Sequence, residues 1–336
     1  MLTEDQIAKR RGTIGASEIA AIMGASPFSS PIDVWLQKTG RSEGFSGNRA
    51  TMAGQYLEAP ILSMYADQTR SVVVHPSVVW PSSTQGMLTH PDLPFVSATP
   101  DGVSFPMQFA GGEYSGELAA EFGVLVDAKN VGFFSGSYYA DGAMPDYYAL
   151  QLVQQMAVTG VRRACLAVLI GGQEFAIRHV QWSAEAEQMV LDAASSFWFD
   201  YVMTDTPPPV DGSDGWTKLI EKRLPSALGP VVRATPEMEE HAKLLVAARE
   251  ERKAIEKREA EHSNKLKSLL GDASGAKGDG WKCSWSKGSE SVSWKELATE
   301  LHKKAAGLFE GKSLDEVAKP FTTVSARRFA VTSKGE

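Results

Sequence analysis

The chain has 336 residues, of which 43% are hydrophobic and 22% charged, and it carries a formal net charge of −7. This composition is that of a globular protein of about two domains and excludes a disordered chain or a fibre, while the negative charge argues against a simple basic nucleic-acid binder. No apolar run approaches the roughly 20 residues of a membrane span, and residues 1–10 lack the apolar core of a signal peptide, so a cytoplasmic protein without a membrane partner is expected.

The acidity is concentrated in the first two thirds of the chain. Residues 1–233 hold 15 Lys and Arg against 24 Asp and Glu, a net charge of −9, whereas residues 234–336 hold 19 against 17, a net charge of +2. A proline-rich and polar run at 206–215 is typical of a linker or a surface crossing. We therefore expect a core of residues 1–206 and a C-terminal extension of residues 207–336.

The core mixes helix and strand signals. Caps, glycine stops and hydrophobic periodicity predict helices over 17–24, 30–40, 50–69 and 147–159. β-branched and aromatic runs predict strands over 72–80, 95–98, 124–128, 165–170 and 175–180, the last two joined as a hairpin. These elements predict an α/β (α+β) fold with a mixed central β-sheet flanked by helices.

The C-terminal extension reads as mainly helical with a small β-hairpin. Thr235-Pro236-Glu237 begins a helix that can run to Leu270, and its thin apolar stripe favours a solvated arm over a strong coiled coil. Trp281, Cys283 and Trp285 alternate as on one face of a strand, and Ser293 to Glu296 form a capping box that opens another helix. Cys165 and Cys283 lack zinc-site spacing, so both are expected to be reduced core residues.

Charged residues at the ends of two apolar strands point to chemistry. Asp101, in Pro100-Asp101-Gly102, follows the strand 95–98, and Asp127 and Lys129 end the apolar run 124–128. Desolvated charges cost several kcal/mol each unless they are paired or bound to metal. Because side chains two apart share a strand face, Asp127 and Lys129 are expected in one site with Asp101. Two carboxylates and a lysine predict an oxygen-rich Mg²⁺ site for phosphodiester hydrolysis.

Five ordered motifs resemble the PD-(D/E)xK nucleases, and within them the lambda exonuclease/YqaJ viral recombinase family. They are Arg10 to Glu18 (continued by Gly24 to Gly40), Gly54 to Glu58, Ala98 to Gly102, Asp127-Ala-Lys129, and Gln151 to Gly160. The match spans residues 10–180. It departs from the family in two ways: Asp127 stands where glutamate is more usual, and a Gly-rich insertion over 104–122, read as a hairpin excursion, follows Asp101.

The resemblance implies a restriction-endonuclease-like core and a role for each matching residue. Asp101, Asp127, the carbonyl of Ala128 and Glu58 would hold Mg²⁺, with Mn²⁺ as an expected substitute, while Lys129 and Gln151 would position water and phosphate. Arg10 and Ser17, with Arg11 as the neighbouring candidate, would anchor a 5′-phosphate. The sequence supports this anchor, since Ser17 is placed at a helix N-terminus and arginine grips phosphate through two hydrogen bonds.

The leading hypothesis is a Mg²⁺-dependent 5′→3′ exonuclease that digests one strand of duplex DNA from its ends and leaves 3′ overhangs for phage-type recombination by single-strand annealing. The resemblance implies a homo-oligomer, a ring-like trimer in the family, a single-strand annealing partner and a phage or prophage gene expressed in a bacterial cytoplasm. The alternatives are a structure-specific or sequence-relaxed endonuclease with the same metal core and a non-catalytic DNA-end binding protein.

Plainer interpretations accompany several residues. Trp281 and Trp285 could stack on bases, but a small hydrophobic cluster is favoured. The charged run 249–261 is interpreted as a solvated helix face, with a DNA or partner contact as the alternative. The six histidines form no metal-ligand spacing and are interpreted as structural or exposed.

Overall fold

The computed structural model of the protein describes residues 11–42, 48–223, 229, 231–278, 281–284, 294–304 and 313. The chain divides into two compact units, Met1–Ile220 and Glu221–Glu336, and the boundary between them comes later than the one expected from the sequence, after residue 206. Residues 207–220 pack on the first unit because Trp216 and Leu219 of α9 (Asp214–Arg223) are buried in its core, and the Trp216 Nε1 donates to the Pro209 carbonyl at 3.0 Å.

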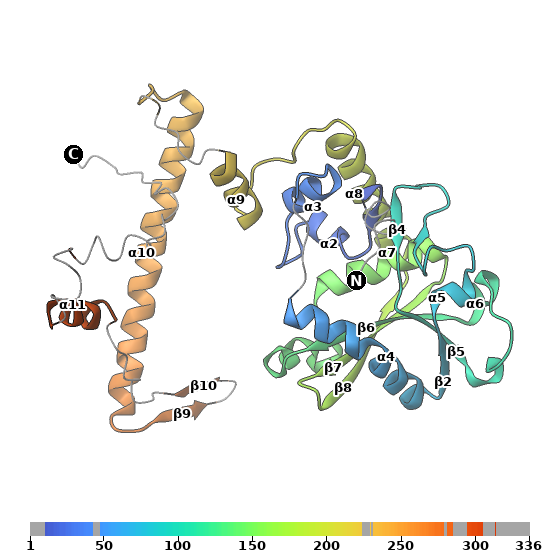
Figure 1. The fold of residues 1–336 in the computed structure, drawn as a ribbon. Helices are drawn as coiled ribbons and strands as arrows, with labels where there is room; N and C mark the ends of the chain where they lie inside the picture. The colour runs from blue at the N-terminus through green and yellow to red at the C-terminus, as the bar shows by residue number, and fades with distance from the viewer. Residues whose placement is uncertain are drawn as a thin grey trace. The chain divides into compact units, whose positions relative to one another are not determined.

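A five-stranded mixed sheet forms the middle of the first unit (Figure 1). Its strands, in spatial order, are β2 (Ser71–Val74), β5 (Gly102–Pro106), β6 (Val124–Val131), β7 (Arg163–Ile170) and β8 (Glu174–Gln181). β6 and β7 are parallel and every other neighbouring pair is antiparallel. The parallel pair requires a crossover, which the chain makes through the 3₁₀ helix η2 (Phe133–Gly142) and α7 (Asp146–Thr159).

Side chains of β6 and β7 alternate between the two faces of the sheet, as the two-residue period of a strand requires. One face packs with α4 (Arg49–Thr69) in a cluster of Ile61, Tyr65, Val126, Cys165, Ala167 and Leu169. The other face packs with α7 and α8 (Ala184–Phe197) in a larger cluster that includes Leu125, Leu152, Met156, Leu166, Val168, Val190 and Phe197. The sheet is therefore the middle layer between helices, and the predicted mixed α/β fold class is confirmed.

Three short strands from the first hundred residues form a second sheet. It is formed by β1 (Ile14–Gly15), β4 (Val96–Ala98) and β3 (Leu88–Thr89), in that order. The buried Gln154 side chain of α7 joins this sheet to the main core, because its Nε2 donates to the carbonyls of Ile14 and Ser97, each at 2.9 Å. A single amide thus satisfies acceptors from two strands that are more than 80 residues apart in sequence.

Replacing Gln154 by alanine is expected to lower the free energy of unfolding by about 2–4 kcal/mol, because it leaves two buried carbonyls without their donor and opens a cavity. Urea unfolding followed by circular dichroism measures this change. Gln188→Ala is the control, since Gln188 is exposed on α8 and its loss should change stability by about 0.5 kcal/mol or less. Equal stability of the two variants would contradict the assigned role of Gln154.

Most predicted elements of the first unit are present, but one helix and one strand are shorter than predicted. α3 (Pro31–Lys38), α4 and α7 match their predictions, and the Ser30–Asp33 capping box is formed. The helix expected over 17–24 is only α2 (Ile19–Ile22), and its N-cap is Glu18, not Ser17. The strand expected over 72–80 ends at Val74, because His75 caps a new helix with proline at its first position, α5 (Pro76–Val79).

The Gly-rich segment after Asp101 is not the hairpin excursion that was expected. It completes β5, turns through the 3₁₀ helix η1 (Met107–Phe109) and forms α6 (Gly116–Phe122), after which the chain returns as β6. β5 pairs antiparallel with β6, so the segment closes a loop between two neighbouring strands of the central sheet. A π-helix, η3 (Trp198–Val202), extends α8.

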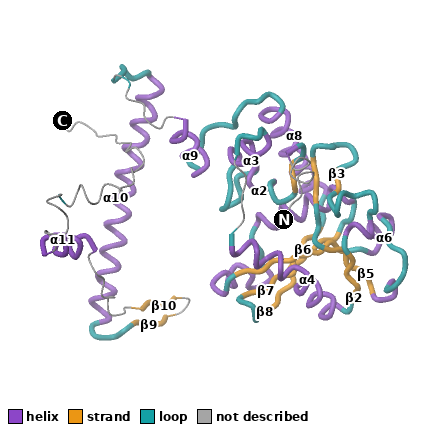
Figure 2. Tube along the Cα trace, viewed as in Figure 1, coloured by secondary structure: helices purple, strands orange, loops and turns teal. Residues whose placement is uncertain are grey.

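The second unit is mainly helical (Figure 2). It contains the 35-residue α10 (Pro236–Leu270), capped by Thr235 as predicted, a hairpin of β9 (Gly275–Gly278) and β10 (Trp281–Ser284), and α11 (Trp294–Lys304). Trp285 and Ser293 lie outside the described residues. Cys165 is a free, buried thiol as expected, but Cys283 is partly exposed. Among the described helices, none is long and apolar enough to cross a membrane.

Candidate active site

The position of Asp101 follows from the register of the central sheet. Gly102, the first residue of β5, is paired with Val126 of β6, so Asp101 comes opposite Asp127 at the point where β5 begins. The Ala128 amide donates a hydrogen bond to the Asp101 Oδ2 at 2.8 Å. The side chain of Asp101 thus accepts the bond that a backbone carbonyl would accept if β5 began earlier. Glycine is required at 102, because a Cβ there would lie 2.7 Å from the Val73 Cγ1 on β2.

Asp127 and Lys129 share one face of β6, as their spacing predicts. The Lys129 Nζ forms an ion pair with the Asp127 Oδ2, and Asp127 is only 1% exposed. The same ammonium lies 5.4 Å from the ring centroid of Tyr148 on α7, within the range of a cation–π contact. This buried carboxylate therefore has its counter-ion beside it, which offsets much of the cost of desolvation.

Two glutamines of α7 hold the other oxygen of Asp127. Gln151 Nε2 donates to the Asp127 Oδ1 at 3.0 Å, and Gln155 Nε2 donates to the same oxygen at 2.8 Å. Gln151 was predicted in the site, but Gln155 was missed. Its only sequence signal is the spacing of four from Gln151, which places both amides on one helix face. Together they fix the orientation of the carboxylate.

Most of these groups line one pocket of about 420 Å³ between α4, the end of β6 and the start of α7, while Asp127 and Gln155 are buried behind its wall. Its walls include Ser17, Ser26, Phe28, Thr51, Gln55, Glu58, Asp101, Ala128, Lys129, Asn130, Tyr147, Tyr148 and Gln151. Glu58 comes from α4, on the opposite side of the sheet from α7. Residues from all five motifs therefore meet in a single pocket.

The carboxylates of the pocket repel one another. Burial, followed by the nearby Asp127, raises the pKa of Asp101 to about 8 against the opposing effect of Lys129. Burial and Asp127 also raise the pKa of Glu58. Burial alone would lower the pKa of Lys129, but the carboxylates of Asp127 and Asp101 outweigh it and raise that pKa, so the ammonium keeps its charge. Because these carboxylates repel one another, binding of a further cation would stabilise their charged forms.

The donor set fits a hard divalent ion. Asp101 and Asp127 supply carboxylate oxygens at one place, the Ala128 carbonyl is adjacent, and Glu58 is near enough for its pKa to respond to Asp127. Within the described residues, no three Asp, Glu, His or Cys side chains form a ready metal cage. Mg²⁺ does not need one, because it is typically bound by one or two carboxylates, its own waters and substrate phosphate.

Mg²⁺ affinity is expected to rise with pH up to about 8 and then level off, because Asp101 must lose its proton to bind the ion. The expected slope is at most about tenfold per pH unit, corresponding to one released proton. Titration calorimetry between pH 6 and 9, in buffers of different ionisation enthalpy, measures affinity and proton release together. Without metal, the raised pKa means that the folded chain binds more protons than the unfolded chain between about pH 4 and 8, so stability should fall as pH rises through that range. A pH-independent affinity would contradict the assignment of Asp101.

The predicted phosphate-anchor residues are only partly placed. Arg10 lies outside the described residues, and Arg11 is exposed and does not line the pocket in the part of the chain that is described. Ser17 lines the pocket, but it does not cap a helix as expected. The adjacent Glu18 instead accepts from the Gly15 amide at 2.7 Å and pairs with the buried Lys38 at 2.6 Å, which fixes the turn that presents Ser17.

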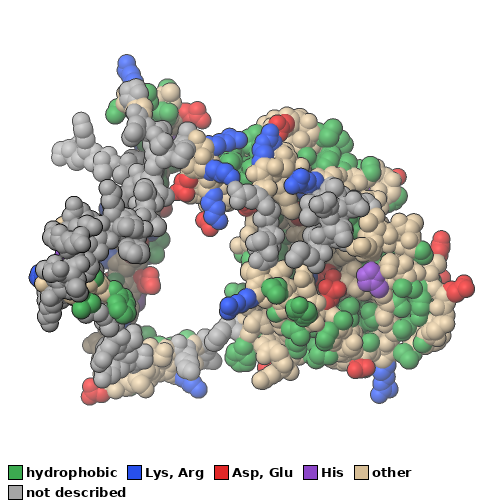
Figure 3. All heavy atoms as spheres, in the orientation of Figure 1, with side chains coloured by type: hydrophobic (Ala, Val, Ile, Leu, Met, Phe, Trp, Pro, Cys, Tyr) green, Lys and Arg blue, Asp and Glu red, His purple; other side chains and the backbone are tan. Residues whose placement is uncertain are grey.

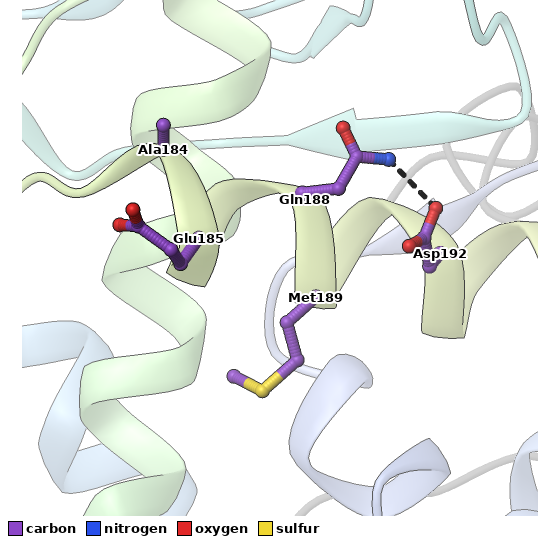
Figure 4. A pocket seen from close by; sticks show the side chains of 5 residues that line it. All are labelled: Ala184, Glu185, Gln188, Met189 and Asp192. Atoms are coloured by element: carbon purple, nitrogen blue, oxygen red, sulfur yellow. Dashed lines mark hydrogen bonds between the residues drawn. The ribbon is translucent and has the colours of Figure 1, made fainter.

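A second hollow lies along α8 and offers no comparable chemistry. Figure 4 shows its lining side chains, Ala184, Glu185, Gln188, Met189 and Asp192, all from this one helix. Gln188 donates to Asp192 at 2.7 Å, so two of the polar groups in this hollow satisfy each other.

On the face of the first unit seen in Figure 3, Lys and Arg gather mainly at the upper edge and uncharged side chains cover most of the remainder.

Residues 7–162 match the model of the YqaJ-like viral recombinase domain. The uncharacterized protein YqaJ of Bacillus subtilis (strain 168) is 24% identical over 279 residues, which cover 81% of this chain and 80% of that protein. These two matches confirm the family resemblance that the five motifs predicted.

Two solved structures are similar at low identity. An alkaline exonuclease from Laribacter hongkongensis is 16% identical and aligns with a TM-score of 0.45 over 66% of this chain and 99% of its own. A phage related exonuclease from Haemophilus somnus 129PT is 11% identical, with a TM-score of 0.39 over 57% of this chain and 96% of its own.

Proposed function

Because residues 7–162 match the YqaJ-like viral recombinase domain, we propose that this chain is a Mg²⁺-dependent 5′→3′ exonuclease on duplex DNA ends. It removes nucleotides from one strand and leaves a 3′ single-stranded overhang for single-strand annealing. The observation that carries the proposal is the pocket lined by Glu58, Asp101, Lys129 and Gln151, the last two of which also contact the buried Asp127. Carboxylates on a strand end beside a lysine are suited to hydrolysing a phosphodiester and ill suited to a mere structural role.

Each residue has a distinct task in this proposal. Asp101, Asp127 and the Ala128 carbonyl would hold Mg²⁺, and Glu58 would complete the acidic ligand set. When bound, the ion polarises the scissile phosphoryl group and lowers the pKa of an attacking water. Lys129 orients that water and offsets the charge that develops on the phosphate oxygens, while Gln151 and Gln155 keep Asp127 in position. The attacking water loses a proton to solvent as its oxygen bonds to phosphorus, the bond from phosphorus to the 3′ oxygen of the terminal nucleotide breaks, and that oxygen takes up a proton from solvent.

The DNA end is held by few, well-placed groups. Ser17 lines the pocket and is proposed to contact the 5′-phosphate, with Arg10 and Arg11 as its cationic partners. Residues 1–233 carry a net charge of −9, so a broad basic face is not expected to supply the affinity. DNA binding should therefore depend on the bound ion. A homo-oligomer, for which a trimer is proposed, a single-strand annealing protein and a bacterial cytoplasmic location belong to the same proposal.

Strand ends should be required for cleavage. We expect linear duplex with 5′-phosphates to be degraded in Mg²⁺ and not in EDTA, closed circular duplex to remain intact, and 5′-hydroxyl ends to be degraded about tenfold to a hundredfold more slowly, since one charge-assisted phosphate contact is worth about 1.5–3 kcal/mol. Gels of 3′-end-labelled linear DNA measure the three reactions of linear duplex, and stained gels measure the closed circles. Cutting of closed circles would indicate an endonuclease, and DNA-end binding without hydrolysis in either Mg²⁺ or Mn²⁺ would indicate a non-catalytic protein.

A further inference from the structure

An aromatic wall stands beside the catalytic groups. Phe28 is 78% exposed, and its ring meets that of Tyr147 at a centroid distance of 5.5 Å and an angle of 83°. Tyr147 in turn lies 4.4 Å from Tyr148, the ring next to Lys129. Phe28, Tyr147 and Tyr148 all line the pocket that contains Asp101. None of them was singled out by the sequence motifs.

Phe28 is presented to the pocket by its backbone. It lies between α2 and α3, where the Phe28 amide donates to the Ser26 Oγ at 3.2 Å, and Ser26 lines the same pocket. The ring is absent from both hydrophobic core clusters of the described residues. A large apolar ring that faces water next to three charged side chains contributes little to folding, so a ligand is the better explanation of its position.

We propose that Phe28 and Tyr147 form a nucleobase-binding subsite for the terminal nucleotide that the enzyme removes. Two rings at nearly a right angle make a corner, in which a flat base can stack on one ring and meet the edge of the other. A pocket of about 420 Å³ is at the small end of ligand sites, the size expected for one nucleotide and not for a folded duplex. Because every base has the same kind of aromatic face, this subsite would bind all four bases.

The charges of the pocket select this occupant. Lys129 attracts a phosphate, as would an ion bound at Asp101 and Asp127, and an aromatic surface in the same pocket suits the base attached to that phosphate. A lipid chain or an apolar peptide would leave the buried carboxylates unsatisfied. This inference rests on the proposed function, since it assumes that a DNA end enters the pocket.

A cycle of protein and substrate changes tests the contact. The full-length wild type, Phe28→Ala and Phe28→Tyr are titrated with linear duplex whose terminal nucleotide has either a normal base or an abasic sugar, in Ca²⁺ so that binding can be followed by anisotropy. Wild type should bind the abasic end about fivefold to a hundredfold more weakly, and Phe28→Ala should bind the normal end more weakly by a similar factor. On the abasic end, the affinity of Phe28→Ala should be nearly the same as that of the wild type. Phe28→Tyr should bind both ends as the wild type does. A terminal 2-aminopurine should be quenched by wild type and much less by Phe28→Ala.

Tyr56→Ala is the matched control, because Tyr56 is equally exposed at 78% on α4 but is not among the residues that line the pocket. Its effect should be the same on normal and abasic ends. If Phe28→Ala weakened both ends equally, or if bound 2-aminopurine stayed bright, the subsite would be refuted while DNA-end binding by the wild type left the proposed function intact. If the wild type neither bound nor degraded linear DNA, the proposed function would fail and the subsite with it.

Discussion

Replacing Asp101 by asparagine should lower the rate of DNA hydrolysis by about a thousandfold or more and leave the fold intact. The loss follows because a metal ion contributes several kcal/mol to stabilisation of the transition state, and the neutral amide is a much weaker ligand. The fold should survive because the amide oxygen can still accept the hydrogen bond from the Ala128 amide. Removal of a carboxylate whose pKa is raised by burial and by Asp127 should even stabilise the metal-free protein at pH 8 and above.

Two measurements on the same preparations test this expectation. Single-turnover degradation of 5′-phosphorylated linear duplex gives the rate, and thermal unfolding at pH 6 and pH 9 in EDTA gives the stability of wild type, Asp101→Asn and Asp101→Ala. Asp92→Asn is the matched control, since Asp92 is an exposed aspartate outside the pocket and should change neither quantity. Wild-type hydrolysis by Asp101→Ala would refute the metal assignment, and an unfolded Asp101→Asn would show that the residue is structural.

Replacing Lys129 by methionine should lower the rate by about a hundredfold to a thousandfold, the usual cost of removing one group that stabilises charge in a transition state. It should also destabilise the protein, because Asp127 is 1% exposed and would lose its counter-ion. Since Lys129 itself is 22% exposed, solvent would weaken this second effect below the cost of a fully buried pair. Activity and stability must therefore be separated.

The double variant Asp127→Asn, Lys129→Met separates them. It removes both charges, so the free energy of unfolding should recover most of what Lys129→Met loses, while hydrolysis stays at the background rate. Lys265→Met is the control for loss of a lysine, since Lys265 pairs with Glu261 on the exposed face of α10. If Lys129→Met kept the wild-type rate, the lysine would act only as the counter-ion of Asp127.

Much of the fold could be read from local patterns. The helices of residues 30–40, 50–69, 147–159 and 235–270 end within a few residues of their predicted positions, because caps, glycines and periodicity act through neighbouring residues. Local signals also explain why the helix expected over 17–24 was predicted too long. A cap-type serine and a glycine stop mark a turn well, but only four residues between them are helical, and Glu18 rather than Ser17 precedes them.

The residues proposed to be catalytic could be predicted for a related reason. A charged pair two positions apart in an apolar strand is a local signal, so Asp127 and Lys129 could be placed on one face without knowledge of the tertiary structure. Part of the negative charge of the chain has a local explanation, because Glu58 and Asp101 line the pocket and Asp127 lies directly behind it. The local sequence therefore determined the elements and the chemistry that they carry.

Only the tertiary structure decided how these groups meet. The register of β5 against β6 sets Asp101 opposite Asp127, and no nearby sequence encodes that pairing. The packing of α7 on the sheet brings Gln155 to Asp127, and the turn before α3 presents Phe28 to the same pocket. These contacts join residues that are 26 or more positions apart, so they depend on strand register and layer packing, which side-chain patterns in a single segment do not specify.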